Sequence, residues 1–432
     1  MLRLAHLAQE DSRLPATRET VGSLTRVVHE LTSRLALRWP TVVYSARHEK
    51  TDRAEEQLEG IRYVRFFPEP DRTLGAGWFR WRNRVARRLG VAEVPYPRSA
   101  AYYWTYIRRV ARHVAVTHPE VIHFHNVSQF TGPLRRAAPH AALVLQMHCE
   151  WLVELPPAEV AARLADVDLV LGVSEHIVRQ IRTAYPEVAA RCRALHNGVD
   201  TARFVPRDAV RTAHGPALDA LRARLGVRGP VVLYVGRLSS EKGVHLLLEA
   251  FARVRQRWPD ASCVLVGPDW GPLRRVAPPS ADDTIDGDYV GRLRRLAAAH
   301  GDRVVFAGAV PNEDLPLYYA VADVLAAPSF HEAFGIPAVE AGASAVPVVA
   351  SAVGGLVDTI AHDRTGLLFP PGDVTALAAA LELVLASPDR ARSLGVAGRE
   401  RVVAEFTWDR IADVLAGYYE DLVAGRATGR AA

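Results

Sequence analysis

The stretch VVLYVGRLSSEKGVHLLLEAFARVRQRW occupies residues 231–258 and contains one complete strand–turn–helix unit. Its first five residues are all apolar, which is typical of a parallel strand that is covered on both faces. Gly236 then permits a tight turn at the end of the strand, and a helical pattern follows over residues 243–258. A strand joined in this way to a helix is the building block of a doubly wound α/β sheet.

The same alternation of short apolar runs and helical patterns recurs along the chain. Strands are predicted over residues 41–45, 121–125, 143–147, 169–173, 231–235, 262–266, 304–307, 324–326 and 346–350. Helices are predicted over residues 22–37, 176–185, 243–258, 314–320, 335–345 and 374–385.

The alternation is interrupted over residues 204–227, a polar segment rich in Ala, Arg and Pro, before a new strand opens at Val231. A chain of 432 residues is also too long for one ordinary core. We therefore predict two Rossmann-like domains with parallel sheets, over residues 1–203 and 204–405, followed by a last helical segment over 406–432.

The bulk composition is typical of a soluble globular protein, with 49% hydrophobic and 23% charged residues and no uninterrupted apolar run of ~18 residues. The N-terminal apolar run meets Glu10 and Asp11 too early for a signal peptide. The net charge of +5 is mild and does not call for a nucleic-acid partner. The cysteines are odd in number and scattered, which indicates a reducing cytoplasm. They are Cys149, Cys192 and Cys263.

A second motif, HEAFGIPAVEA at residues 331–341, contains two glutamates separated by seven residues. Gly335 and Pro337 start a helix whose first backbone N–H groups are free to bind an anion. Glu332 on the loop and Glu340 in the helix lie on either side of that N-terminus, where they can reach sugar hydroxyls. The same carboxylates also favour the positive end of a helix, so the motif alone leaves both interpretations open.

The segment GRLSSEKG, residues 236–243, places two cations at the end of the strand over 231–235. Arg237 can grip phosphate oxygens with two hydrogen bonds, and Lys242 acts as a point charge. The alternative is a solvated basic loop. That alternative is weakened because the chain has only one other lysine, Lys50; the abundance of arginine is typical of a GC-rich bacterial genome.

Together these motifs resemble those of glycosyltransferase family 4, a large family of retaining GT-B glycosyltransferases, over nearly all of residues 195–405. The resemblance implies two Rossmann-like domains that face a cleft, the first binding the acceptor and the second the donor, with a C-terminal crossover helix packing on the N-domain. It also implies transfer of a sugar from a nucleotide diphosphate sugar, with a UDP-sugar favoured, to a hydroxyl of a glycan, a lipid or a small natural product. The nucleotide sugar is a co-substrate, and no cofactor or metal is expected.

The resemblance also assigns roles to the motif residues. Arg237 and Lys242 belong to the loop that binds the donor diphosphate, Glu332 faces the donor sugar, and Glu340 bonds the ribose hydroxyls. The remaining donor-binding residues in this half are Gly236, Phe334, Gly335 and Ile336.

The N-terminal half resembles the family more weakly. His148 follows the strand at 143–147 and matches a histidine that hydrogen-bonds the transferred sugar; a purely structural histidine is the alternative. Strand alternation places His123 and His125 on one face. The family's Gly-Gly loop is reduced here to Gly22, which we predict as a donor-binding residue.

The segment between Trp78 and Leu89 is basic, aromatic and partly amphipathic. It fits a peripheral contact with an anionic membrane at the inner face, a docking site for an acidic or aromatic acceptor, or an exposed Arg-rich helix whose aromatic rings pack inward.

Three other functions remain open. They are a GDP-mannose-dependent mannosyltransferase, a UDP-sugar epimerase of the same two-lobed fold, and a non-catalytic scaffold, against which the pairing of basic and acidic motifs argues. A dinucleotide-dependent oxidoreductase is disfavoured because no Gly-x-Gly-x-x-Gly follows a predicted strand.

Overall fold

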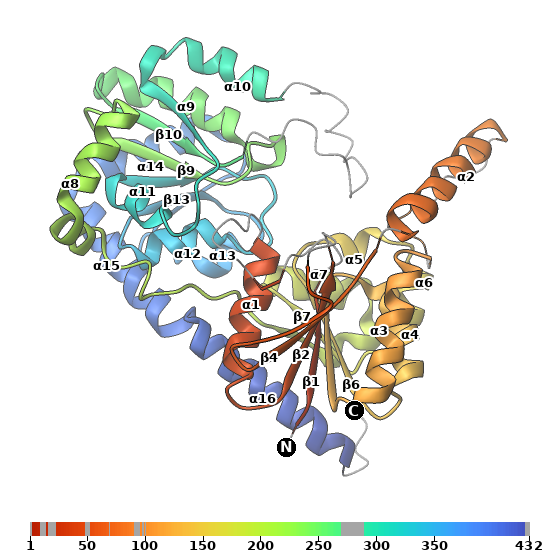
Figure 1. Ribbon diagram of the computed structural model, residues 1–432. Coiled ribbons are helices and arrows are strands. Elements are labelled where there is room, and N and C mark those ends of the chain that lie inside the picture. Colours follow the sequence, from red (N-terminus) through yellow and green to blue (C-terminus); the bar gives the residue numbers. More distant parts are fainter. Residues whose placement is uncertain are drawn as a thin grey trace. The chain divides into compact units, whose positions relative to one another are not determined.

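The computed structural model describes residues 2–8, 14–15, 23–47, 52–68, 70–89, 96, 99, 101–268 and 289–427. The chain divides into two compact units (Figure 1). Unit 1 comprises Met1–His196 and Trp408–Ala432, and unit 2 comprises Asn197–Thr407.

The break between the units falls after His196, earlier than the boundary expected after residue 203. The segment that follows packs on unit 2. Val199 forms a bridge with Thr407, and the Arg399 guanidinium donates to the backbone carbonyls of Thr201 and Phe204. These contacts depend on residues some 200 positions away, so no local pattern marks them.

Unit 1 is built on one sheet. Its strands are β1 (Leu4–Leu7), β2 (Thr41–Ala46), β3 (Glu55–Leu58), β4 (Ile61–Phe66), β5 (Val121–His125), β6 (Ala142–Met147), β7 (Leu169–Gly172) and β8 (Cys192–Ala194). Within the described residues the strand order is β3-β4-β2-β1-β5-β6-β7-β8. All neighbours are parallel except β3 and β4, which form an antiparallel hairpin at the edge. The sequence analysis had not predicted that hairpin.

The helices of unit 1 are α1 (Ser23–Leu35), α2 (Ala76–Arg88), α3 (Trp104–Thr117), α4 (Thr131–Ala137), α5 (Trp151–Glu154), α6 (Pro157–Leu164), α7 (Glu175–Ala184) and α16 (Trp408–Ala427). The last of these, α16, belongs to the same core as β1, β5 and β6. Its buried residues Trp408, Ile411, Leu415 and Tyr419 share one hydrophobic cluster with the strands and with α1. Unit 1 is therefore completed by a segment from the far end of the chain.

Unit 2 carries a second sheet. Its strands are β9 (Val231–Val235), β10 (Ser262–Val266), β11 (Val304–Gly308), β12 (Val324–Ala327), β13 (Val348–Ser351) and β14 (Leu367–Phe369). In the part of the chain that the structure describes, the order is β11-β10-β9-β12-β13-β14, and every pairing is parallel. The order runs outward in both directions from β9 and β12. These two strands therefore flank the topological switch point, where ligands of doubly wound sheets bind.

The helices of unit 2 are α8 (Arg207–Leu225), α9 (Val244–Arg257), α10 (Tyr289–Ala298), α11 (Leu315–Val321), α12 (Ile336–Ala343), α13 (Leu356–Thr359), α14 (Val374–Ala386) and α15 (Pro388–Glu405). The segment interpreted as an interruption, residues 204–227, is largely the helix α8. Helical geometry is broken at His214, two residues before Pro216, which explains why its periodicity was hard to recognise.

None of the helices in the described residues is both long and apolar enough to span a bilayer.

Candidate functional site

The loops that leave β9 and β12 interlock at the switch point of unit 2. Phe330 donates its backbone N–H to the Glu241 carbonyl at 2.8 Å, and the Lys242 ammonium donates to the His331 carbonyl at 3.2 Å. Gly243 has φ +64°, and a Cβ there would lie 2.0 Å from the Pro328 carbonyl oxygen. The two sequence motifs, which are almost 90 residues apart, are thus one structural feature.

Within this feature Lys242 and Glu332 form an ion pair. The Lys242 Nζ lies 2.9 Å from Glu332 Oε2, and the two side chains are 17% and 19% exposed. Partial burial strengthens the attraction and holds both groups in one geometry. The pair presents a cation and a carboxylate side by side, as a phosphorylated sugar requires.

Arg237 is placed differently. Its guanidinium pairs with Glu241 at 2.5 Å, but both side chains are about half exposed. Such pairs contribute about 0–1 kcal/mol, so Arg237 is free to exchange Glu241 for a phosphate. The buried Tyr234 hydroxyl donates to the Arg237 carbonyl at 2.6 Å and braces the turn after Gly236. Burial, with Glu332 nearby, raises the pKa of Tyr234 well above its ordinary value.

The loop that carries Glu332 is held by a glycine pair after β13. Gly355 donates its N–H to the Glu332 carbonyl at 2.8 Å. A Cβ at Gly354, where φ is +50°, would lie 1.9 Å from that same carbonyl oxygen, and one at Gly355 would lie 2.4 Å from the Ala333 oxygen. The close approach of the two backbones therefore requires glycine at both positions.

The helix α12 begins directly after this loop. Its N-cap is Gly335, with φ +95°, so no side chain there competes for the first backbone amides. The preceding Phe334 is buried and packs against Phe406, with ring centroids 5.9 Å apart. Ile336 opens the helix. Pro337 has no N–H, and the N–H groups of Ala338 and Val339 both donate to the Gly335 carbonyl. An anion at this point therefore meets the Ile336 N–H and the positive end of the helix dipole.

Glu340 lies one turn into α12 and is only 5% exposed. The Tyr319 hydroxyl donates to Glu340 Oε2 at 2.8 Å, and the Asn312 amide lies 3.4 Å from Oε1. Asn312 is itself fixed by Arg203, whose guanidinium donates to its amide oxygen at 2.9 Å. Burial, followed by the Glu340 charge, raises the pKa of Tyr319 well above its ordinary value.

The sequence analysis missed Tyr319 and Asn312, the residues that orient Glu340. They lie 21 and 28 residues from it in the chain, and no spacing rule connects them. Tyr319 lies on α11 and Asn312 lies in the loop before it, so only the tertiary fold brings them to Glu340.

In unit 1, His148 follows β6, where the sequence placed it. Its backbone N–H donates to Asn126 Oδ1 at 2.8 Å, and its Nε2 lies 2.9 Å from His125 Nδ1. Burial lowers the pKa of His148 to about 3, so the imidazole is neutral at physiological pH. A neutral imidazole suits a hydrogen bond to a sugar hydroxyl and does not add a charge. Gly22, the other site residue predicted in this half, lies outside the described residues.

Behind His148 lies a buried histidine layer, formed by His6, His123 and His125. Each is at most 1% exposed. His123 Nδ1 lies 2.6 Å from the Tyr419 hydroxyl of α16, and His6 Nε2 lies 3.3 Å from it. The layer joins the strands β1 and β5 to the C-terminal helix through polar contacts.

In the described part of the chain, these three histidines are also the group that could hold a metal ion, since one nitrogen from each lies within 4.8 Å of the others. A zinc ion bound at about 2.0–2.1 Å in tetrahedral geometry needs nitrogens roughly 3.4 Å apart. That separation lies within the 4.8 Å limit on the spacing of the three nitrogens. Our expectation of a metal-independent protein remains a prediction.

Comparison with known proteins defines the class. Residues 221–401 match the family described as glycosyl transferases group 1, and residues 24–203 match glycosyltransferase family 4. A sucrose-phosphate synthase of known structure from Thermosynechococcus elongatus is similar with a TM-score of 0.77 and 27% identity, covering 98% of this chain and 100% of that one. The fold is that of the GT-B glycosyltransferases, which confirms the fold prediction.

Sequence relatives define the family. The GDP-mannose-dependent alpha-(1-6)-phosphatidylinositol monomannoside mannosyltransferase of Mycolicibacterium smegmatis is 33% identical over an alignment 308 positions long, which covers 67% of this chain and 74% of that protein. A glycogen synthase of Mycobacterium tuberculosis is 28% identical over an alignment 424 positions long, which covers 92% of this chain and 91% of that protein. The chain belongs to glycosyltransferase family 4, and it is a glycosyltransferase.

We predict that Gly354→Ala abolishes most of the transfer activity. The added Cβ displaces the Glu332 carbonyl and is strained at φ +50°, and the free energy of unfolding should fall by about 1–3 kcal/mol. Urea unfolding and initial rates measure the two effects. Gly215→Ala is the matched control, because a Cβ there meets nothing within 4 Å. Equal behaviour of the two variants would show that the loop contact does not matter.

We also predict that acid destabilises unit 1. Burial lowers the pKa of His6 to about 3 and lowers those of His123 and His125 well below 6.5, so the unfolded chain binds more protons than the native one in this range. The free energy of unfolding therefore rises with pH up to about 6.5, and lowering the pH from about 7 to about 5.5 should cost about 1 kcal/mol for each histidine.

Urea titrations of the parent chain and of His123→Gln at the two pH values test this expectation. The variant should lose about 1 kcal/mol less than the parent on acidification, because glutamine takes up no proton. His140→Gln, at an exposed histidine, should behave like the parent. An unchanged pH dependence in His123→Gln would contradict the assignment of neutral buried imidazoles.

Proposed function

We propose that the chain transfers a sugar from a nucleoside diphosphate sugar to a hydroxyl acceptor, with retention of the anomeric configuration. The observation that carries this proposal is the partly buried pair of Lys242 and Glu332 beside the N-terminus of α12. Both groups lie at the carboxyl ends of β9 and β12, where doubly wound sheets bind nucleotides. Family membership supports the same chemistry.

The reaction requires stabilisation of the charge that develops on the departing diphosphate. Lys242, Arg237 and the positive N-terminal end of α12 supply positive potential for that charge. We assign Glu332 to the donor sugar, Glu340 to the ribose hydroxyls, and His148 to a hydroxyl of the transferred sugar. The acceptor oxygen bonds to the anomeric carbon, the bond from that carbon to the phosphate oxygen breaks, and the leaving phosphate takes the acceptor proton.

For the donor we propose a UDP-sugar, as the sequence analysis favoured. GDP-mannose is the second candidate, because the mycobacterial relatives at 33–36% identity are named as GDP-mannose-dependent enzymes. The two donors share the diphosphate and the ribose, so the contacts described for unit 2 serve both. The base distinguishes them, and a binding measurement identifies it.

Thermal unfolding with UDP, GDP, ADP or NAD at about 100 times the Kd tests the donor site. One nucleoside diphosphate should stabilise the chain by about 2.7 kcal/mol, because it binds the native state alone. Glu340→Ala and Lys242→Ala should each lose most of that stabilisation. Glu249→Ala, an exposed glutamate on α9, is the control and should respond like the parent.

The outcome also ranks the alternatives. Stabilisation by UDP or GDP that depends on Glu340 and Lys242 supports the donor site and names the base, and transfer assays with that donor series follow. If no nucleotide acts, or if the variants respond like the parent, the site is wrongly placed and a scaffold is the better interpretation. A donor that is converted without any acceptor indicates an epimerase.

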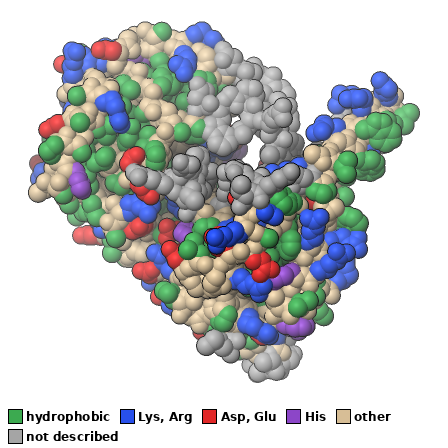
Figure 2. Space-filling model, viewed as in Figure 1, with side chains coloured by type: hydrophobic (Ala, Val, Ile, Leu, Met, Phe, Trp, Pro, Cys, Tyr) green, Lys and Arg blue, Asp and Glu red, His purple; other side chains and the backbone are tan. Residues whose placement is uncertain are grey.

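A second observation favours an acceptor carried by a membrane. The side chains of Trp78 and Trp81 on α2 are 53% and 58% exposed, whereas Phe79 between them is buried. The prediction that the aromatic rings of this helix pack inward is therefore correct for Phe79 alone. The helix carries arginines and no acidic residue, and Figure 2 shows basic and hydrophobic side chains together on its surface. This combination is typical of helices that lie in the interface of an anionic bilayer.

We propose that α2 binds anionic membranes peripherally. Leu74 and Trp104, which are 75% and 49% exposed, extend its apolar surface. With Trp78 they line a hollow of about 310 Å³, wide enough for part of a lipid acceptor. The arginines add attraction to anionic headgroups, worth about 1 kcal/mol each near the surface.

Vesicle sedimentation tests this contact. The parent should bind phosphatidylglycerol vesicles more tightly than phosphatidylcholine vesicles, and added salt should weaken the binding. Replacing both Trp78 and Trp81 by Ala should weaken it at least about tenfold, since about 1.4 kcal/mol of apolar burial is lost. Leu37→Ala removes an apolar side chain that is 85% exposed elsewhere on unit 1 and should have no effect. Equal binding of both variants would contradict the role of α2.

A further inference from the structure

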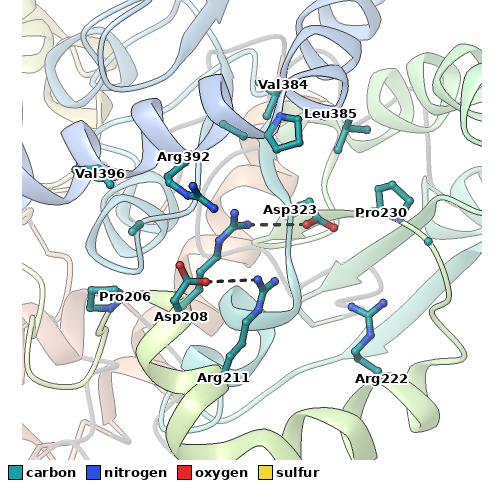
Figure 3. Close-up of a pocket in the computed structure, with 15 residues that line it drawn as sticks. Pro206, Asp208, Arg211, Arg222, Pro230, Asp323, Val384, Leu385, Arg392 and Val396 are labelled. Atoms are coloured by element: carbon teal, nitrogen blue, oxygen red, sulfur yellow. Dashed lines mark ion pairs between the residues drawn. The ribbon is translucent and has the colours of Figure 1, made fainter.

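Unit 2 contains a pocket of about 420 Å³ (Figure 3). It lies at the amino ends of the strands β9 and β12, opposite to the candidate donor site at their carboxyl ends. Pro230 and Asp323, which line it, directly precede β9 and β12, whereas the donor loops follow the carboxyl ends of these strands. A ligand in this pocket is therefore separated from the donor by the length of the strands. We call it the arginine pocket, because four arginines line it: Arg207, Arg211, Arg222 and Arg392.

The arginine pocket has more positive than negative charge. Two carboxylates line it, and each has a partner: Asp323 Oδ1 lies 3.9 Å from Arg207, and Asp208 Oδ1 lies 3.5 Å from Arg211. Among the described residues, Arg222 and Arg392 have no carboxylate within ion-pair distance. Two guanidinium charges are thus left uncompensated, which matches the charge of a phosphate monoester dianion.

Two of the four cations, Arg207 and Arg211, are held by hydrogen bonds to the backbone. Arg207 is 17% exposed and donates from Nη1 to the Ala322 carbonyl at 2.9 Å, and Arg211 donates from Nε to the Ala320 carbonyl at 3.2 Å. Burial and the neighbouring Arg211 and Arg392 lower the pKa of Arg207. The pocket therefore combines two anchored guanidinium groups, those of Arg207 and Arg211, with the uncompensated charges of Arg222 and Arg392. Arginine forks match phosphate oxygens in geometry.

The rest of the wall is apolar. Val384 and Leu385 from α14 and Val396 from α15 line the pocket beside the arginines (Figure 3). Concave sites of roughly 300–1,000 Å³ that combine apolar walls with a few charged groups are typical of small-molecule binding. A nucleic acid would instead need an extended basic stripe, so the local concave shape favours a small anion with an uncharged part.

We propose that the arginine pocket is a second ligand site, which binds the phosphate monoester of a small metabolite, either a sugar phosphate or a nucleoside monophosphate. The phosphate accepts hydrogen bonds from Arg222 and Arg392, with Arg211 at its side. The uncharged part of the ligand lies against Val384, Leu385 and Val396. This site is independent of the nucleotide-sugar donor, so both ligands are bound at once.

Isothermal titration of the full chain with glucose 6-phosphate and with AMP tests the proposal and distinguishes the two sources of the phosphate. Arg222→Ala and Arg392→Ala should each raise the Kd of the better probe at least tenfold. Arg253→Ala, an exposed arginine on α9 outside the pocket, should leave the Kd unchanged. Saturating UDP or GDP, whichever the donor site binds, should also leave it unchanged.

Four results would overturn the proposal. The first is that neither probe binds at millimolar concentration, and the second is that the Kd is the same in Arg222→Ala and Arg392→Ala as in the parent. The third is competition with the nucleoside diphosphate, which would place the probe in the donor site. The fourth is binding of inorganic phosphate as tight as that of both monoesters, which would show an adventitious ion only. Thermal stabilisation by the nucleotide is unaffected by any of these results, so the donor assignment is judged separately.

Discussion

The backbone contact between the Glu332 loop and the glycine pair after β13 constrains the whole candidate donor site. The Glu332 carbonyl accepts a hydrogen bond from Gly355, and the space beside it admits no Cβ at Gly354. This contact fixes the height of the loop above the sheet. The position of the loop then determines where Glu332 meets Lys242 and where the first amides of α12 emerge.

A different kind of constraint operates in unit 1. The histidine layer places three neutral imidazoles between the sheet and α16, and Tyr419 bonds to two of them. Buried polar groups of this kind are costly unless they are paired. The C-terminal helix therefore contributes the hydroxyl that pairs with His6 and His123, in addition to apolar surface. His148 Nε2 lies 2.9 Å from His125 Nδ1. The arrangement of the histidine layer therefore also affects the position of His148, which we assign to the sugar.

The amino and carboxyl ends of the strands in the unit 2 sheet both carry positive potential, but from different groups. At the carboxyl ends, the N-terminal end of α12 and the ion-paired Lys242 act together, and the site is built from two loops. At the amino ends, the arginine pocket relies on side chains from α8 and α15. The first arrangement follows from the topology of any doubly wound sheet, whereas the second depends on where this chain places its arginines.

The sequence by itself determined the fold class, because the alternation of apolar strands and helices is a local pattern with a fixed period. It also indicated Lys242, Glu332 and Glu340 as candidate site residues, since a glycine turn after a strand and a helix N-terminus are local features. Only the tertiary structure decided which groups support them. Tyr319 and Asn312 reach Glu340 through tertiary contacts. The boundary between the units depends on hydrogen bonds from Arg399. The arginine pocket is lined by residues from separate segments of the chain. Contacts of this kind are set by long-range packing, which no short-range periodicity encodes.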